Sequence, residues 1–110
     1  MNIKYIDQNG TEIKVGDILK YDEGIGCARA IHEVVLFNGK LSGTTRIGEP
    51  FWTEYNDDKP IELMFYQLMG SKDESGICYN AEIIGNINNN PELLSIQTAI
   101  NIFCEDGDKQ

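Results

Sequence analysis

Few residues of this chain could do chemistry, and most of them do not combine into a catalytic site. His32 is the only histidine, and the three cysteines, Cys27, Cys78 and Cys104, lie far apart in the sequence. An acyl-transfer site needs a nucleophile, a base and an orienting acid in contact. No nucleophile signature surrounds Cys27 or Cys78, so His32 is better explained as a packed or rim residue of a strand. We therefore expect no enzyme.

The same scarcity argues against a metal site or a cofactor. The sequence has no C-x-x-C pair and a single histidine, so one chain cannot assemble a structural zinc site of the usual kind. The glycine-rich segment 24–29 ends in Arg29 and could cradle a phosphate with its backbone N–H groups. A flexible turn explains it more simply, because no helix follows to assist anion binding. We expect no metal and no cofactor.

Segment 46–66 is the part of the sequence most like a binding site, because it gathers aromatic rings near a cation. Trp, Tyr and Arg dominate binding hot spots. The predicted ligand- or partner-binding residues, drawn from this segment and the strand before it, are Arg29, His32, Arg46, Trp52, Tyr55 and Tyr66. The rings could stack a nucleobase while the arginines hold phosphate. The alternative is that Phe51 and Trp52 only close one end of a β-barrel.

Charge narrows the choice of partner. Eighteen acidic residues face nine basic ones, giving a net charge of -9. Such a surface repels phosphate backbones, which argues against a nucleic acid polymer, and it speeds encounter with a basic protein. Solubility alone is the simpler explanation of the charge. The odd cysteine count suits a reducing cytoplasm, the first ten residues do not form a signal peptide, and no apolar run reaches membrane-spanning length.

Turn signals divide the 110 residues into short β-strands of one domain. Asn9-Gly10 and Asn38-Gly39 each lie between β-branched or aromatic residues and predict a hairpin. Segments 60–70 and 76–85 alternate apolar and polar residues, so we expect them to pair as a third hairpin. Segment 48–60, bounded by prolines, is predicted to be a long loop or irregular edge.

The last twenty residues allow two interpretations. A short turn is expected at 91–94, with Asn90 as its N-cap and Pro91 at its first position. Residues 94–102 then alternate between apolar and polar types, and most of the apolar ones are β-branched, which favours a strand over 95–103. Helical spacing of Leu93, Ile96, Ile100 and Phe103 is the alternative. We expect the strand, followed by a frayed end.

Two stretches carry a family resemblance. "DQNGTEIKVGDILKY", residues 7–21, and "AEIIGNINNNPELL", residues 81–94, resemble the YopX family of phage and prophage proteins. The family pattern matches at Asp7, Asn9-Gly10, Glu12-Ile13, Gly16-Asp17-Ile18 and Tyr21, and then at 82–87 and 90–94. The resemblance spans residues 5–94. The chain departs from many relatives by beginning almost at the first motif and by continuing past the second.

The resemblance implies a phage or prophage origin and a mostly β fold, which we expect to be a small SH3-like or partly open β-barrel. It divides the chain into a YopX-like domain, 1–94, and a C-terminal extension, 95–110. The family has no catalytic residues to carry over.

We therefore expect a non-enzymatic accessory protein that neutralises a host component in the bacterial cytoplasm, in counter-defence. It would sequester a signalling nucleotide or cover a host defence protein. A phage structural or interaction module with no host target is the alternative. The extension 95–103 is a candidate interface of a homo-oligomer.

Overall fold

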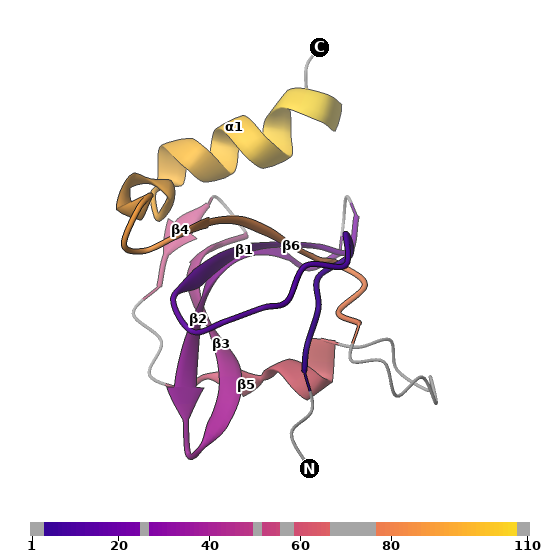
Figure 1. The fold of residues 1–110 in the computed structure, drawn as a ribbon. Coiled ribbons are helices and arrows are strands. Elements are labelled where there is room, and N and C mark those ends of the chain that lie inside the picture. Colours follow the sequence, from indigo (N-terminus) through magenta and orange to yellow (C-terminus); the bar gives the residue numbers. More distant parts are fainter. Residues whose placement is uncertain (1–3, 25–26, 50–51, 56–58, 67–76, 108–110) are drawn as a thin grey trace.

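Antiparallel strands build most of the structure (Figure 1). The computed structural model describes residues 4–24, 27–49, 52–55, 59–66 and 77–107. Its strands are β1 (Asp17–Asp22), β2 (Arg29–Phe37), β3 (Lys40–Gly48), β4 (Thr53–Glu54), β5 (Ile61–Glu62) and β6 (Ala81–Asn86). They form one sheet in the order β4-β3-β2-β1-β6, with β5 also paired to β3, and the sheet does not close into a barrel. The prediction of a mostly β fold is confirmed.

The hairpin predicted at Asn38-Gly39 is confirmed. It joins β2 to β3, with Phe37 opposite Lys40 at its end. Asn38 has a φ of 53° and Gly39 a φ of 77°. Positive φ at both central residues is what a type I′ turn requires, and this turn matches the twist of the strands that it connects.

The chain reverses at Asn9-Gly10 as predicted, but the two flanking segments do not form a regular hairpin. They meet in one isolated antiparallel bridge, between Ile6 and Glu12, with backbone hydrogen bonds from Asp7 to Thr11 and from Ile13 to Tyr5. The carboxylate of Asp7 also closes the turn, because its Oδ1 accepts hydrogen bonds from the backbone N–H groups of Asn9 and Thr11, each at 2.9 Å. An Asp side chain that bonds to the backbone just after it competes with strand pairing.

The same carboxylate joins the beginning of the chain to β6. Asp7 is 2% exposed, and its Oδ2 accepts a hydrogen bond of 3.0 Å from the backbone N–H of Ile83. Gln8 adds a backbone hydrogen bond to Ala81, and Ile87 adds another to Gly16. Since β6 pairs with β1, the two stretches that carry the family resemblance lie side by side in the sheet (Figure 1).

The third predicted hairpin is wrong. In the described part of its first half, residues 60–66, only β5 (Ile61–Glu62) is a strand, and it pairs with β3. The chain then turns into the 3-10 helix η1 (Leu63–Tyr66), which buries Leu63 and Tyr66. β6 pairs with β1 and not with this segment. The predicted turn between the two halves of the hairpin falls on residues 67–76, outside the described part of the chain.

The short turn after Asn90 is confirmed as the 3-10 helix η2 (Pro91–Leu93), although the Asn90 side chain does not cap it. Asn90 instead accepts a hydrogen bond from the backbone N–H of Asn86 through its Oδ1, at 3.3 Å. This contact holds the η2 turn back against the end of β6.

The predicted strand over 95–103 is wrong, because residues Ile96–Gly107 form the helix α1. The Oγ of Ser95 accepts a hydrogen bond of 3.2 Å from the backbone N–H of Thr98, which is N-capping geometry. Ala99 and Phe103, four residues apart, are buried against the sheet. Burial of one helical face outweighs the strand preference of the β-branched residues. None of the described helices is long and apolar enough to cross a membrane.

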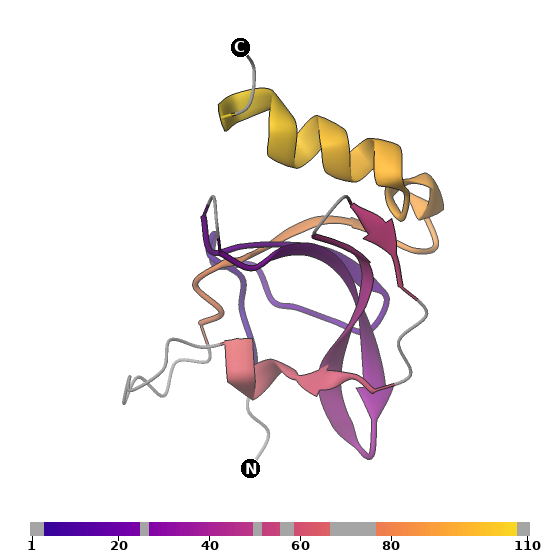
Figure 2. The same cartoon turned by 180° about the vertical axis from the view of Figure 1, so that it is seen from behind.

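The sheet has two apolar faces, and each has its own cover. Figures 1 and 2 show α1 across one side of the sheet and the β5–η1 segment across the other. On the helix side, Ile18, Ile31 and Ile47 pack in one cluster with Ala99 and Phe103. A second cluster unites residues of the opposite face with η1: Ile13, Leu19, Val34, Leu63, Tyr66, Cys78 and Ala81. Alternation along β2 therefore sends successive side chains into different cores.

We predict that Asp7→Ala lowers the free energy of unfolding by about 3 kcal/mol, because it leaves three backbone N–H groups without their charged acceptor. Urea unfolding followed by circular dichroism measures the change. Asp22→Ala is the control, since Asp22 accepts one such bond, from Gly24, and its loss should be about 1 kcal/mol. Equal losses for the two variants would contradict this role of Asp7.

Candidate functional site

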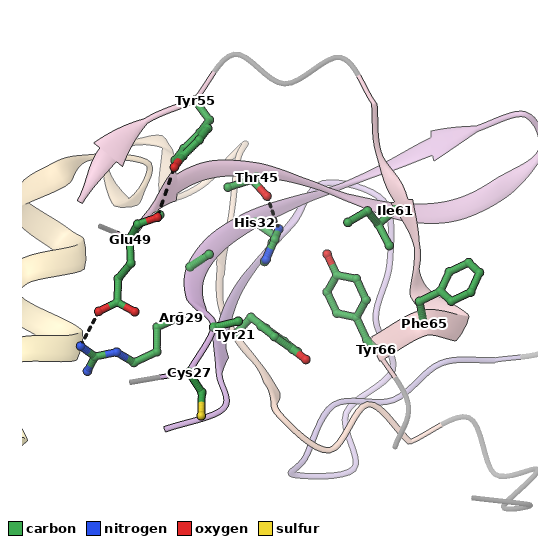
Figure 3. A pocket seen from close by; sticks show the side chains of 13 residues that line it. Tyr21, Cys27, Arg29, His32, Thr45, Glu49, Tyr55, Ile61, Phe65 and Tyr66 are labelled. Atoms are coloured by element: carbon green, nitrogen blue, oxygen red, sulfur yellow. Dashed lines mark hydrogen bonds and ion pairs between the residues drawn. The ribbon is translucent and has the colours of Figure 1, made fainter. Parts of the chain in front are cut away.

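A pocket of about 810 Å³ lies between the central strands and the β5–η1 segment (Figure 3). Tyr21 of β1, His32 of β2 and Thr45 of β3 line it from the sheet. Ile61 of β5 and Tyr66 of η1 line it from the opposite side. These five residues come from five elements, and only the folding of the chain brings them together.

Three rings form the inner surface of the pocket. Tyr21, His32 and Tyr66 contact one another edge to face, with centroids 5.2 to 5.8 Å apart. His32 lies directly opposite Thr45 in the ladder, and its Nδ1 is 3.3 Å from the Thr45 Oγ1. The Tyr21 hydroxyl donates a hydrogen bond to the carboxylate of Glu23. Each of the three rings therefore packs against the other two.

Apolar side chains surround the opening. Ile61, Phe65 and Tyr55 line the pocket and are 47%, 62% and 39% exposed. The Tyr55 ring lies against Gly48, where an added Cβ would lie 3.2 Å from it, and its hydroxyl donates to the backbone carbonyl of Glu49 at 3.2 Å. Exposed apolar side chains grouped around a concavity are typical of a binding site.

An ion pair forms one end of the pocket. The Nη2 of Arg29 is 2.7 Å from the Oε2 of Glu49, and both residues line the pocket. The Arg29 guanidinium also donates to the backbone carbonyl of Phe103 in α1, at 3.3 Å, and lies 5.3 Å from the ring centroid of Trp52. Figure 3 shows this guanidinium turned toward the helix and away from the three inner rings.

The structure brings four of the six predicted binding residues to this pocket: Arg29, His32, Tyr55 and Tyr66. Arg46 does not line it and pairs with Glu33 at 2.8 Å. Trp52 does not line it either, and it stacks on Phe103 with ring centroids 4.8 Å apart. Trp52 is thus packed between the sheet and the helix, a structural role similar to the alternative in which Phe51 and Trp52 only close one end of a barrel. Phe51 lies outside the described residues.

Sequence reasoning missed Tyr21, Glu49 and Phe65 as pocket residues. Tyr21 shares a strand face with Leu19, and this alternation was the available signal for it. Its place beside His32 follows from the pairing of Leu19 with His32, which the sequence does not encode. Glu49 and Phe65 carry no local signal, because their positions depend on how the loops fold back on the sheet.

The described residues of the pocket do not form a site for cysteine-based or metal-dependent catalysis. Burial raises the pKa of the Cys78 thiol to about 12, which favours the unreactive thiol over the thiolate. Cys27 is exposed at the pocket, and a single cysteine at a surface does not define a nucleophile site. Among the described residues, no group of three or more His, Cys, Asp or Glu side chains is placed to hold a metal ion.

Comparisons with known proteins do not add a relative: no protein-family model matches the chain, and no curated protein matches it. What the pocket can bind is therefore inferred from its own residues.

We predict that Tyr66→Phe raises the free energy of unfolding by about 1 kcal/mol. The Tyr66 hydroxyl is buried with no hydrogen-bond partner among the described residues, and it lies against Gly43, where an added Cβ would be 2.2 Å from it. Removing it relieves an uncompensated desolvation. Tyr55→Phe, which loses a hydrogen bond, should show no such gain in urea unfolding. A loss of stability in Tyr66→Phe would contradict the assignment.

A second prediction concerns alkaline pH. Burial raises the pKa of Tyr21 and of Cys78 to about 12, and it raises that of Tyr66 as well. In the unfolded chain these groups lose their protons at their ordinary pKa values of 9.0 for Cys and 10.0 for Tyr. Above pH 9 the unfolded state then binds fewer protons than the folded state. The contribution of these groups to the free energy of unfolding is therefore fully present below about pH 9 and is lost as pH rises toward 12.

Melting temperatures at a series of pH values from 8 upward measure this fall. Tyr66→Phe should show a smaller decrease with pH than the parent chain, since it lacks one of the three groups. A melting temperature that stays constant across this range would contradict the expected linkage.

Proposed function

We propose that this chain is a non-enzymatic phage or prophage accessory protein that binds and neutralises a host protein bearing a basic surface. The observation that carries the proposal is the pocket, which is aromatic inside, apolar at its opening and closed at one end by an ion pair. Such a site offers contact area and a few directed polar groups, and its described residues do not assemble a set of catalytic side chains.

The charges favour a protein over a nucleotide as the ligand. Arg29 and Arg46, the two arginines expected to hold phosphate, are engaged by Glu49 and Glu33. A phosphate would have to displace a carboxylate from one of them, within a chain of net charge -9. A basic protein meets no such obstacle, and the negative surface speeds its approach.

Sequestration of a signalling nucleotide is the second candidate. Tyr21, His32 and Tyr66 all line the pocket, and the ring of Tyr21, the least buried of the three, is the one on which a base could stack. This candidate predicts that the phosphate-binding side chain is Arg29, released from Glu49.

The resemblance to the YopX family supports the proposed phage or prophage origin, and counter-defence in the bacterial cytoplasm is the purpose that we propose for a small accessory protein of that origin. The two stretches that carry it pair through β1 and β6 and through Asp7, so they belong to one structural unit. We also propose that the bent, open sheet is a variant of the small SH3-like barrel. A phage interaction module with no host target is the competing class, and self-association is a further possibility that the experiment below separates.

Capture from bacterial lysate on the immobilised chain tests the proposal. We expect the parent chain to retain a basic protein and Phe65→Ser to lose it, since Phe65 is at the pocket opening and 62% exposed. Leu36→Ser is the matched control, because Leu36 is 63% exposed and does not line the pocket.

Thermal shift with cyclic and linear nucleotides runs in parallel. A stabilising nucleotide would favour sequestration instead. Retention of no basic protein, or equal retention by Phe65→Ser and the parent chain, would contradict the proposal. Retention of the chain's own copies alone would point to self-association.

A further inference from the structure

We infer that the pocket receives a cationic side chain of the partner, an arginine or lysine, with the carboxylate of Glu49 as its counter-charge. This inference rests on the proposed function and names the chemical group that the site selects. It makes Glu49 a specificity-determining residue, a role that sequence reasoning did not assign to it.

Glu49 is held in place, and within the described part of the chain one of its carboxylate oxygens has no hydrogen-bond donor. Its Oε2 pairs with Arg29, whereas no described residue donates to its Oε1. Its side chain is 30% exposed, so the carboxylate is partly shielded from water and still reachable. The Tyr55 hydroxyl donates to the Glu49 carbonyl, and the Glu49 N–H donates to the Arg29 carbonyl at 3.4 Å. A carboxylate fixed by these contacts is ready for a second donor without reorganising.

The guanidinium of Arg29 contacts both Glu49 and the helix side of the sheet. Its side chain is 7% exposed, and its guanidinium bonds to the Phe103 carbonyl and lies over the rings of Trp52 and Phe103. Figure 3 shows it on the helix side of Glu49. A cation in the pocket would therefore share Glu49 with Arg29 and bind the carboxylate oxygen that Arg29 does not contact.

The rest of the lining favours a cation over an anion or a neutral group. Ring faces attract cations, and Tyr21, Tyr55 and Tyr66 all line the pocket. Glu23, bonded to the Tyr21 hydroxyl, adds a second negative charge nearby. An apolar group in the pocket would shield the Oε1 of Glu49 from water without donating a hydrogen bond to it, and burying a carboxylate oxygen in this way is unfavourable. Long aliphatic stems, which Arg and Lys both have, can pack against Ile61 and Phe65 at the opening.

Two probes of the same shape test the charge. Nα-acetyl-arginine amide carries the guanidinium, and Nα-acetyl-citrulline amide replaces it with a neutral urea. Both are titrated into the parent chain, with adenosine monophosphate as the anionic probe, and the amide signals of Ala30 and Gly48, which line the pocket, are followed by NMR. We expect the arginine probe to bind about tenfold more tightly than the citrulline probe, equivalent to about 1.4 kcal/mol.

Three variants localise the effect. Glu49→Gln should remove the preference for the arginine probe. Glu33→Gln is its matched control, because Glu33 also pairs with an arginine, at 2.8 Å, but does not line the pocket. Tyr55→Leu keeps the ion pair of Glu49 and Arg29 but removes one ring and the hydrogen bond to the Glu49 carbonyl, so it should weaken the arginine probe several-fold. Fluorescence of Trp52, the single tryptophan, reports whether α1 stays docked in each variant.

The outcomes separate the inference from the proposed function. Equal binding of the arginine and citrulline probes, or no binding of the arginine probe at millimolar concentration, overturns the inference, and host-protein capture that still depends on Phe65 would leave the proposed function standing. Preference for adenosine monophosphate over both amino acid probes overturns both. A preference for arginine that survives Glu49→Gln and Tyr55→Leu overturns the role of this site.

Discussion

The buried carboxylate of Asp7 is the constraint on which the arrangement of the sheet depends. It accepts two hydrogen bonds from its own turn and one from Ile83, 76 residues later. A carboxylate that is 2% exposed has to be satisfied by such donors, since an unpaired buried charge is strongly unfavourable. The first turn, joined to β6 by Asp7 and by the hydrogen bond from Gln8 to the Ala81 carbonyl, also covers part of the outer edge of β6. Covering an edge strand in this way limits its pairing with other chains.

The two faces of the central strand β2 have different roles: one packs against α1, and the other lines the pocket. Ile31 packs toward α1, whereas the next residue, His32, lies on the pocket side. Arg29, at the start of the same strand, contributes to both, since it lines the pocket and bonds to Phe103 of α1. The helix and the pocket therefore lie on opposite faces of the same strand, β2. This arrangement explains why a buried cation is present in an acidic chain: aromatic rings, a carbonyl and a carboxylate all stabilise it.

Local signals predicted the fold where the local geometry decides the outcome. Asn38-Gly39 adopts the positive φ values that its residue types favour, and the chain does turn at Pro91. Predictions were wrong where a distant contact competes. Segment 60–70 has the alternation of a strand, but β3 offers it only a two-residue pairing, and burial of Leu63 and Tyr66 favours a 3-10 turn. In the same way, Ser95 and the buried face of Ala99 and Phe103 make α1 a helix despite its β-branched residues.

The sequence by itself determined the acidic character, the scarcity of catalytic side chains, the mostly β class and the residue types of the pocket. Only the tertiary structure decided which of these residues meet. A bulge between β2 and β3 places Thr45 opposite His32 and Ile47 opposite Ile31, leaving Arg46 between them, paired with Glu33 and outside the pocket. Because a one-residue shift reverses the face of every following side chain, no pattern of residue types could assign Arg46 and Trp52 away from the pocket, or Tyr21 and Glu49 to it.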